Sequence, residues 1–281
     1  MREGQFSRTA LSAAGRRAAH QVLDGGVVFA DPLAVRILGP DAEEAVARDR
    51  ERPERRPLRL FVAMRSRLAE DAARRAIGEG VRQVLVLGAG LDTFGYRLDA
   101  VEGLRVFELD HPATQRDKRR RLAESGIGEP ARVAYVAHDF ERGSMTAALS
   151  AAGLDTGRRT FVLWLGVAPY LTEEAVFATL AELGRFPGGV EVVFDYANPT
   201  HAIDRATTRA YHERLEANVA AKGEPFRCHL DTDALIKRAR ALGYSEIEDF
   251  DRVALHARYL PALAPATRSG PGGHVMRMAA R

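Results

Sequence analysis

The chain has 281 residues, with 41 lysines and arginines against 38 aspartates and glutamates, and 46% of its residues are hydrophobic. This balance excludes a largely disordered protein, because the apolar content suffices for a sizeable core and the net charge is only +3. No apolar run approaches the roughly 18 residues that cross a bilayer, and the first residues lack the apolar core of a signal peptide. The single cysteine, Cys228, cannot form an internal disulfide, so we expect a cytoplasmic protein that has no membrane partner.

In chain order, residues 1–60 are mostly polar with helical patterning, and Pro53 and Pro57 predict a loop before the first core helix. Residues 61–80 carry apolar side chains at helical spacing, which predicts that helix. Residues 84–87 form a short apolar run that ends at a glycine, typical of a buried parallel strand.

Strands and helices then alternate along the chain. The patterns predict strands at 105–109, 132–136, 160–165 and 190–194, and helices at 113–125 and 172–185, the latter with Thr172 as N-cap. This alternation indicates an α/β fold with a doubly wound, mostly parallel sheet. The tail adds a helix at 232–242 and short strands near Ile247 and Val275.

We expect a single domain rather than two. Its parts are a helical cap (1–60), a ligand-binding core (61–197), a charged helical lid insertion (198–227) and a segment that completes the sheet (228–281). The sequence does not decide between a monomer and a homodimer.

One dense basic run, from Arg116 to Arg121, holds five cationic residues in six positions. Its helical spacing predicts a solvated helix face rather than a nucleic-acid surface. The small net charge agrees with that interpretation, so we expect no nucleic-acid partner.

The strand at 84–87 runs into Gly88-Ala-Gly90-Leu-Asp92-Thr93, and the next strand ends at Asp110, about 20 residues after the glycines. Glycines at a strand's carboxyl end let a ligand approach the backbone, and a carboxylate there can accept hydrogen bonds from both ribose hydroxyls. A dinucleotide-binding loop would carry a third glycine where this chain has Thr93, and an acid such as Asp92 opposes a pyrophosphate. The loop therefore favours S-adenosylmethionine, although a tight turn beside a surface acid remains an alternative.

Two further strand exits carry candidate pocket residues. After the third strand, Asp139 could accept a hydrogen bond from the adenine amino group, and Phe140 could pack on the base. The alternative is that the two residues only form a polar loop after the strand. After the fourth, Gly166, Pro169 and Tyr170 fit either a pocket wall or a plain turn.

These residues resemble the leucine carboxyl methyltransferase-like family of S-adenosylmethionine-dependent O-methyltransferases. The similarity rests on Gly-Ala-Gly-Leu-Asp-Thr-Phe-Gly-Tyr-Arg-Leu at 88–98, and it extends to Phe29-Ala-Asp-Pro, to the helix that carries Arg65, to 107–112 with Lys118, and to Gly223-Glu-Pro-Phe226. Within the family, the chain is most similar to the bacterial branch that includes tetracenomycin-type polyketide O-methyltransferases. The resemblance implies a class I methyltransferase-like fold.

The resemblance also implies roles for matching residues. Arg65 would pair with the methionine carboxylate, and Asp110, next to Leu109, would hold the ribose. Gly88, Ala89 and Gly90 would line the methionine moiety, Asp139 and Phe140 would contact the adenine, and Arg8 or Thr9 would close over the cofactor. The chain departs from many relatives at Leu165, which stands near the cofactor's amino-acid end where they carry a glutamate; this removes a partner for the ammonium group.

The resemblance further implies methylation of a small-molecule carboxylate to its methyl ester, in natural-product metabolism, with no metal. The alternatives are a phenol or alcohol acceptor, which would need a general base, an RNA-modifying methyltransferase, a protein that binds the cofactor without methylating, and a nicotinamide dehydrogenase. We select Tyr170, His201 and Tyr211 as candidate catalytic residues from a set of polar side chains expected near the acceptor, namely Tyr170, Tyr196, His201, Arg205, Tyr211 and His229.

Overall fold

A computed structural model describes residues 7–140, 143–202, 206–221, 223–263 and 273–281. Its helices are α1 (Arg8–Leu23), α2 (Asp41–Arg50), α3 (Arg56–Gly78), α4 (Phe94–Arg97), α5 (Pro112–Glu124), α6 (Met145–Ala151), α7 (Glu173–Gly184), α8 (Ala206–Ala220), α9 (Thr232–Ala241) and α10 (Arg252–Tyr259). Its strands are β1 (Gln83–Leu87), β2 (Arg105–Asp110), β3 (Val133–Ala137), β4 (Thr160–Trp164), β5 (Val190–Ala197), β6 (Glu246–Phe250) and β7 (Gly273–Ala280).

The strands form one sheet in the order β3-β2-β1-β4-β5-β7-β6. The first five are parallel, whereas β7 runs antiparallel between β5 and β6. The α/β fold with a mostly parallel, doubly wound sheet is thus confirmed. Strand order reverses between β1 and β4, and ligands in such sheets bind beside that switch at the carboxyl ends of the strands.

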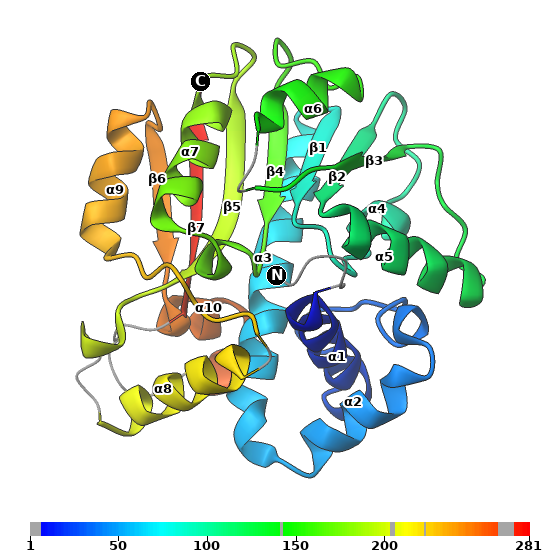
Figure 1. The fold of residues 1–281 in the computed structure, drawn as a ribbon, viewed down its shortest axis with the longest axis vertical. Coiled ribbons are helices and arrows are strands. Elements are labelled where there is room, and N and C mark those ends of the chain that lie inside the picture. Colours follow the sequence, from blue (N-terminus) through cyan, green and yellow to red (C-terminus); the bar gives the residue numbers. More distant parts are fainter. Residues whose placement is uncertain (1–6, 141–142, 203–205, 222, 264–272) are drawn as a thin grey trace.

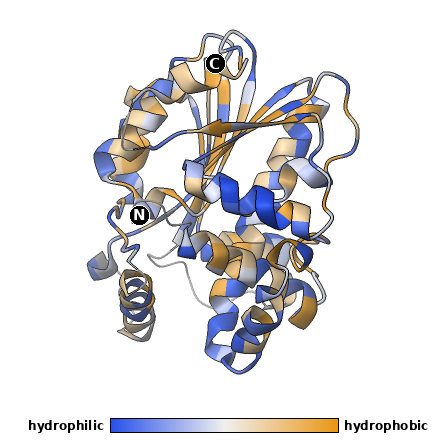
Figure 2. Cartoon of the chain, turned by 45° about the vertical axis from the view of Figure 1, so that its right-hand side comes forward, coloured by the Kyte–Doolittle hydropathy of each residue, from blue (hydrophilic) through white to orange (hydrophobic). Residues whose placement is uncertain are grey.

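Helices cover both faces of the sheet (Figure 1). Alternate side chains of β1 point to opposite faces, so Leu85 joins a core that includes α6, α7 and α9, and Val86 joins a second core that includes α3, α4 and α10. Burial on both faces explains why the central strands are nearly continuous apolar runs. Figure 2 shows these strands as mostly hydrophobic and the outer helices as largely hydrophilic outside.

The N-terminal segment packs as a cap with a small core of its own. Ala14 and Ala18 of α1 meet Ile37 and Leu38, and Leu122 of α5 closes this cluster from the main body. Helices α1, α2 and α8 gather at one end of the sheet (Figure 1), which is where the glycine loop after β1 lies.

Two element boundaries differ from the sequence-based expectation by three residues or more. Helix α3 begins at Arg56 rather than at residue 61, because Pro57 lies in the first turn, where a missing N–H leaves no hydrogen bond unmade. Strand β5 extends to Ala197 rather than ending at 194, because it pairs with β7 along its whole length and because the buried Asp195 within it bonds Arg65 and Gly166.

The basic run on α5 is only partly a solvated face, which corrects the prediction. Lys118 is buried against Glu108 at 2.6 Å, and Arg121 is buried with Asp41 and Asp117. The exposed Arg119 and Arg120 form ion pairs with acids of the same region. This surface is therefore largely neutralised. Across the described part of the chain, no helix combines the length and hydropathy that a membrane crossing requires.

Candidate functional site

A cavity of about 600 Å³ lies at the carboxyl ends of β1, β2, β3 and β4. Its wall combines the glycine loop at 88–92, the strand exits at Asp110 and 138–140, the segment from Leu165 to Leu171, the start of α1, and residues 223–225. Segments far apart in sequence thus meet at the edge where the sheet topology places a ligand.

The glycine loop is fixed by β2. The N–H groups of Gly88 and Ala89 donate to the carbonyl of Leu109 at 2.7 and 3.2 Å, and the N–H of Gly90 donates to Oδ2 of Asp110 at 2.6 Å. Gly88, Ala89 and Gly90 all line the cavity, and their contact with the methionine moiety stays a prediction. Leu109 does not: its side chain is fully buried in the sheet core, and it serves the loop through its carbonyl alone.

Asp110 lies in the cavity wall, and two backbone N–H groups fix the orientation of its carboxylate. Its Oδ1 accepts from the N–H of His111 at 2.6 Å, and its Oδ2 accepts from Gly90. Burial raises the pKa of this carboxyl, while the two N–H donors favour its ionised form. Each carboxylate oxygen can accept a second hydrogen bond, so Asp110 retains the capacity to bind two hydroxyls.

The backbone at Gly88 tolerates no side chain. Its φ of +62° is left-handed, and an added Cβ would come within 2.3 Å of the Val167 side chain. We expect Gly88→Ala to abolish binding of S-adenosylhomocysteine, measured by calorimetry, because the loop must move out of the wall. Gly103, with φ +70° and open space around it, is the matched control: Gly103→Ala carries the same backbone strain and should bind normally. Equal affinities in the two variants would contradict this.

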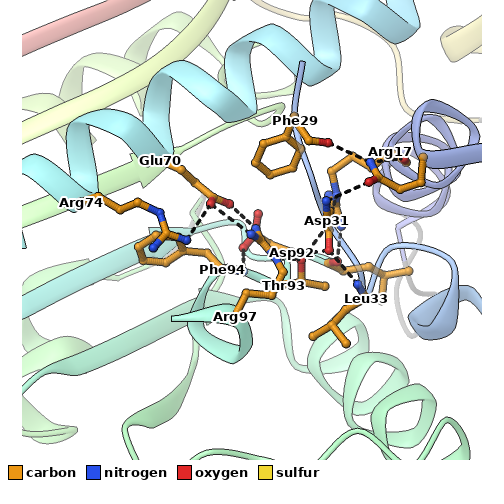
Figure 3. Close-up of polar contacts among 12 residues, drawn as sticks. Arg17, Phe29, Asp31, Leu33, Glu70, Arg74, Asp92, Thr93, Phe94 and Arg97 are labelled. Atoms are coloured by element: carbon orange, nitrogen blue, oxygen red, sulfur yellow. Dashed lines mark hydrogen bonds and ion pairs between the residues drawn. The ribbon is translucent and has the colours of Figure 1, made fainter. Parts of the chain in front are cut away.

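Asp31 ties the N-terminal cap to the glycine loop (Figure 3). Its fully buried carboxylate accepts from Nε of Arg17 at 3.2 Å, from the Thr93 hydroxyl at 2.8 Å and from the N–H of Leu33 at 3.1 Å, and it pairs with Arg97. Arg17 also donates to the carbonyl of Leu91 at 2.6 Å. This network explains why the chain has threonine at position 93, where a dinucleotide-binding loop would have glycine: the buried Thr93 hydroxyl donates to Asp31.

The adenine-side candidates lie together in the wall. Asp139 and Phe140 both line the cavity, with His138 beside them at a ring distance of 6.0 Å from Phe140. Burial lowers the pKa of His138, which favours the neutral imidazole at neutral pH. The departure at Leu165 also lies in this wall and presents an apolar side chain.

Glu224 lines the first cavity and bonds the start of α1, a contact that the sequence analysis did not predict. Its carboxylate accepts from the N–H groups of Arg8 and Thr9, each at 2.9 Å, and from the Thr9 hydroxyl. It therefore binds the positive end of the α1 dipole and its unpaired N–H groups. Thr9 lines the cavity, whereas the exposed Arg8 does not, so of these two candidates Thr9 is the one in the wall.

A second cavity, of about 680 Å³, adjoins the first. Both walls include Thr9, Val62, Arg65, Gly166 and Tyr170, so a ligand in one would meet a ligand in the other at these residues. The second cavity is bounded by α3, α8, the loop before α3 and residues 195–197.

Arg65 lies at this junction. Its Nη1 donates to Oδ2 of Asp195 at 2.5 Å, and Oδ1 of Asp195 accepts from the N–H of Gly166 at 2.5 Å. The Nε of Arg65 is buried and has no hydrogen-bond partner among the described residues. A buried guanidinium N–H that lacks a protein partner fits an anionic ligand group such as a carboxylate.

The proposed catalytic residues lie in different places. Tyr170 is in both walls, where burial raises the pKa of its hydroxyl to about 12 and its ring packs on Phe226 at 5.1 Å. His201 is exposed in a short turn after β5 and lies in neither wall. The side chain of Tyr211, on α8, and all of Arg205 fall outside the described residues.

Two other polar candidates form hydrogen bonds within the protein, and the sequence analysis did not predict one residue that lines the second cavity. Tyr196 donates to Asp249 at 3.0 Å while lining the second cavity, and His229 bonds Glu216 at 2.9 Å. His212 of α8 lines the second cavity, and burial lowers its pKa. A histidine on a charged helix carries no sequence signal that would single it out.

Together these features fit S-adenosylmethionine. Asp110 can accept from ribose hydroxyls, the unpartnered Nε of Arg65 can donate to the amino-acid carboxylate, and the glycine backbone leaves room between them. The wall of the first cavity also includes four acids, and the N–H groups of its glycine loop are already bonded to β2, which suits a cationic, phosphate-free ligand; the acids are Asp92, Asp110, Asp139 and Glu224.

Comparison with known proteins agrees with this geometry. Residues 10–184 match the family described as leucine carboxyl methyltransferase. YktD of Bacillus subtilis, named as a candidate S-adenosylmethionine-dependent methyltransferase, is 28% identical over 279 residues, which cover 89% of this chain and 91% of that protein. A similarly named protein of Saccharopolyspora erythraea is 40% identical over 121 residues, which cover 43% of this chain and 42% of that protein.

Among solved structures, the apo form of the S-adenosylmethionine-dependent methyltransferase SibL is 20% identical, with a TM-score of 0.46, and the match covers 95% of this chain and 70% of that one. The family match spans more than half of the chain and includes Arg65, the glycine loop, Asp110 and Tyr170. The chain therefore belongs to the leucine carboxyl methyltransferase family and is an S-adenosylmethionine-dependent methyltransferase.

Proposed function

We propose that this methyltransferase acts on oxygen and converts a carboxylate of a small molecule, such as a natural-product intermediate, into its methyl ester. The observation that carries the proposal is the junction of the two cavities, where Arg65 and Tyr170 face both the cofactor site and the adjoining space. Both are hydrogen-bond donors at neutral pH, because the pKa of Tyr170 is raised to about 12. Donors at this point suit an acceptor that arrives already ionised.

When bound, S-adenosylmethionine would supply a methyl group on its sulfonium: the acceptor oxygen would attack the methyl carbon in line, the S–CH3 bond would break, and S-adenosylhomocysteine would leave as a neutral thioether. The protein's part is then positioning rather than proton transfer. Asp110 and the glycine loop hold the nucleoside end, and Arg65 holds the amino-acid end. The Tyr170 hydroxyl donates to one oxygen of the acceptor carboxylate, which orients the other oxygen toward the methyl group.

The experiment is a matched acceptor panel at neutral pH, in which each carboxylic acid is paired with the phenol of the same ring system, and products are identified by mass. We expect methyl esters from carboxylates, with S-adenosylhomocysteine formed in equal amount. The rate should change little between about pH 6 and 9, because a carboxylate is ionised throughout that range. Asp110→Ala should form no product and serves as the control. Transfer to phenols alone would overturn the carboxylate assignment.

A phenol acceptor is the second candidate, and His212 is the observation that favours it. Its lowered pKa leaves a neutral imidazole in the second cavity, and a neutral imidazole is a suitable general base. If a phenol is the acceptor, His212→Gln should lower kcat about 10²- to 10⁴-fold. If the acceptor is a carboxylate, His212→Gln should leave kcat unchanged. Cofactor binding without product from any acceptor would favour the third alternative, a binding protein that does not methylate.

A further inference from the structure

The second cavity is elongated along α3. One face of the helix forms a continuous wall, because the lining residues recur after three or four positions; they are Pro57, Leu58, Phe61, Val62 and Arg65. Arg55, which precedes the helix, lines the same cavity ten residues before Arg65. That separation is about 15 Å along the helix axis. The cavity therefore has one end at the cofactor junction and another end far from it.

The middle of the cavity is largely apolar. Between Arg55 and Arg65, α3 contributes Leu58, Phe61 and Val62; Leu215 and Val219 of α8 and Phe226 add further apolar surface, beside the polar His212 and Asn218 of α8. Such a lining favours a hydrocarbon or aromatic body and offers it few hydrogen bonds.

The remote end is cationic. Arg48, Arg52 and Arg55 line it from the segment before α3, and Arg252 lines the cavity from α10. Arg48 pairs with Glu44 and Arg55 pairs with Asp49 at 2.6 Å, so these two are already neutralised. Arg52 and Arg252 are exposed, and neither forms an ion pair with an acid of the described residues. Glu54 is the acid that this segment adds to the wall, and with Arg52 and Arg252 both lacking an ion pair within the described residues the wall as a whole keeps an excess of positive charge.

We propose that the acceptor is an elongated, mostly apolar molecule that carries an anionic group at the end opposite to its methylated oxygen. Its body lies along α3, and its remote anion binds the exposed guanidinium groups of Arg52 and Arg252, which offer paired donors. A small acid would reach only one end of a cavity of about 680 Å³. The inference rests on the proposed function only in taking this cavity as the acceptor site.

The test uses calorimetry on the protein saturated with S-adenosylhomocysteine, so that no turnover is needed. The probes are hexanedioate and dodecanedioate, each compared with its monomethyl ester, which keeps the length but has a single charge. We expect dodecanedioate to bind about ten- to a hundredfold more tightly than its monomethyl ester, the gain typical of hydrogen bonds to a charged group. Hexanedioate is too short to reach both ends and should show no such preference.

The double variant Arg52→Gln/Arg252→Gln should remove the preference for dodecanedioate over its monomethyl ester. Arg119→Gln/Arg120→Gln removes two exposed arginines of α5 outside both cavity walls and should keep the preference. Equal binding of dodecanedioate and its ester, or a preference that survives the Arg52/Arg252 variant, would overturn the inference. Failure of the proposed function gives a different pattern, in which the preference is present and sensitive to Arg52 and Arg252 but no methyl ester forms.

Discussion

Asp31→Ala is expected to destabilise the fold by about 3–5 kcal/mol, the cost typical of breaking a buried ion pair by removing one partner. The Asp31 side chain is fully buried and is the acid that faces both Arg17 and Arg97. Without it, Arg17 retains the carbonyl of Leu91 but loses its counter-charge, whereas Arg97 retains Glu70. Urea denaturation at neutral pH measures the change, as a lower midpoint at unchanged slope.

The control for this prediction is Asp71→Ala. Asp71 also pairs with an arginine, Arg67, at 2.8 Å, but both side chains are partly exposed, and such pairs contribute about 0–1 kcal/mol. Thr93→Val covers the case in which Asp31→Ala does not fold, because it removes one donor to Asp31 while keeping the volume of the side chain. It should cost about 1–3 kcal/mol, since an acceptor loses its partner in a buried site. A loss for Asp31→Ala no larger than that for Asp71→Ala would refute the role given to this residue.

The same network shows what a single sequence can and cannot predict. The β-branched runs, the glycine after β1 and the acid at the end of β2 are local signals: the runs form strands, and Gly88 and Asp110 lie in the cavity wall, where their contacts with the cofactor stay a prediction. The Thr172 N-cap is equally local, since its side chain accepts from the N–H three residues later. Periodicity and capping depend on neighbours in the chain, which is why they can be read in advance.

The remainder depends on contacts between distant segments. Asp31 meets residues 14, 62 and 66 positions away, and Glu224 accepts from an N–H 216 positions away. The Lys118 side chain of α5 is buried because it pairs with Glu108 on the neighbouring strand; the spacing of charges on the helix does not predict this. No local pattern distinguishes an arginine or lysine with a buried partner from one that faces water.

The antiparallel β7 is a case of the same kind. Its residues alternate no more clearly than those of β6, yet it lies between β5 and β6 and bonds both. Short strands near the end of the chain were expected, but their order in the sheet was not. By pairing with β5 as far as Ala197, β7 supports the strand end that holds Asp195 and, through it, Arg65 and Gly166.

Arg65→Lys is the prediction that separates cofactor binding from stability. A lysine can keep the pair with Asp195, but it has no counterpart of the buried Nε, the group that has no protein partner among the described residues. We expect the affinity for S-adenosylhomocysteine to fall about ten- to a hundredfold, the loss of a charged hydrogen bond. The free energy of unfolding should change no more than in Arg75→Lys, a control on the same helix whose arginine pairs with Glu191 at 2.5 Å outside both cavity walls.

A second ligand makes this prediction specific to the carboxylate. 5′-Methylthioadenosine has the nucleoside and the sulfur but no amino-acid group, so its binding should depend on Asp110 and not on position 65. If Arg65 holds the carboxylate, Arg65→Lys weakens S-adenosylhomocysteine and leaves 5′-methylthioadenosine unchanged. A loss of equal size for both ligands would instead mean that Arg65 acts through Asp195 and Gly166, by holding the loop after β4 in place. The difference between the two losses measures the contribution of the guanidinium to carboxylate binding, because effects on the loop and on folding cancel in it.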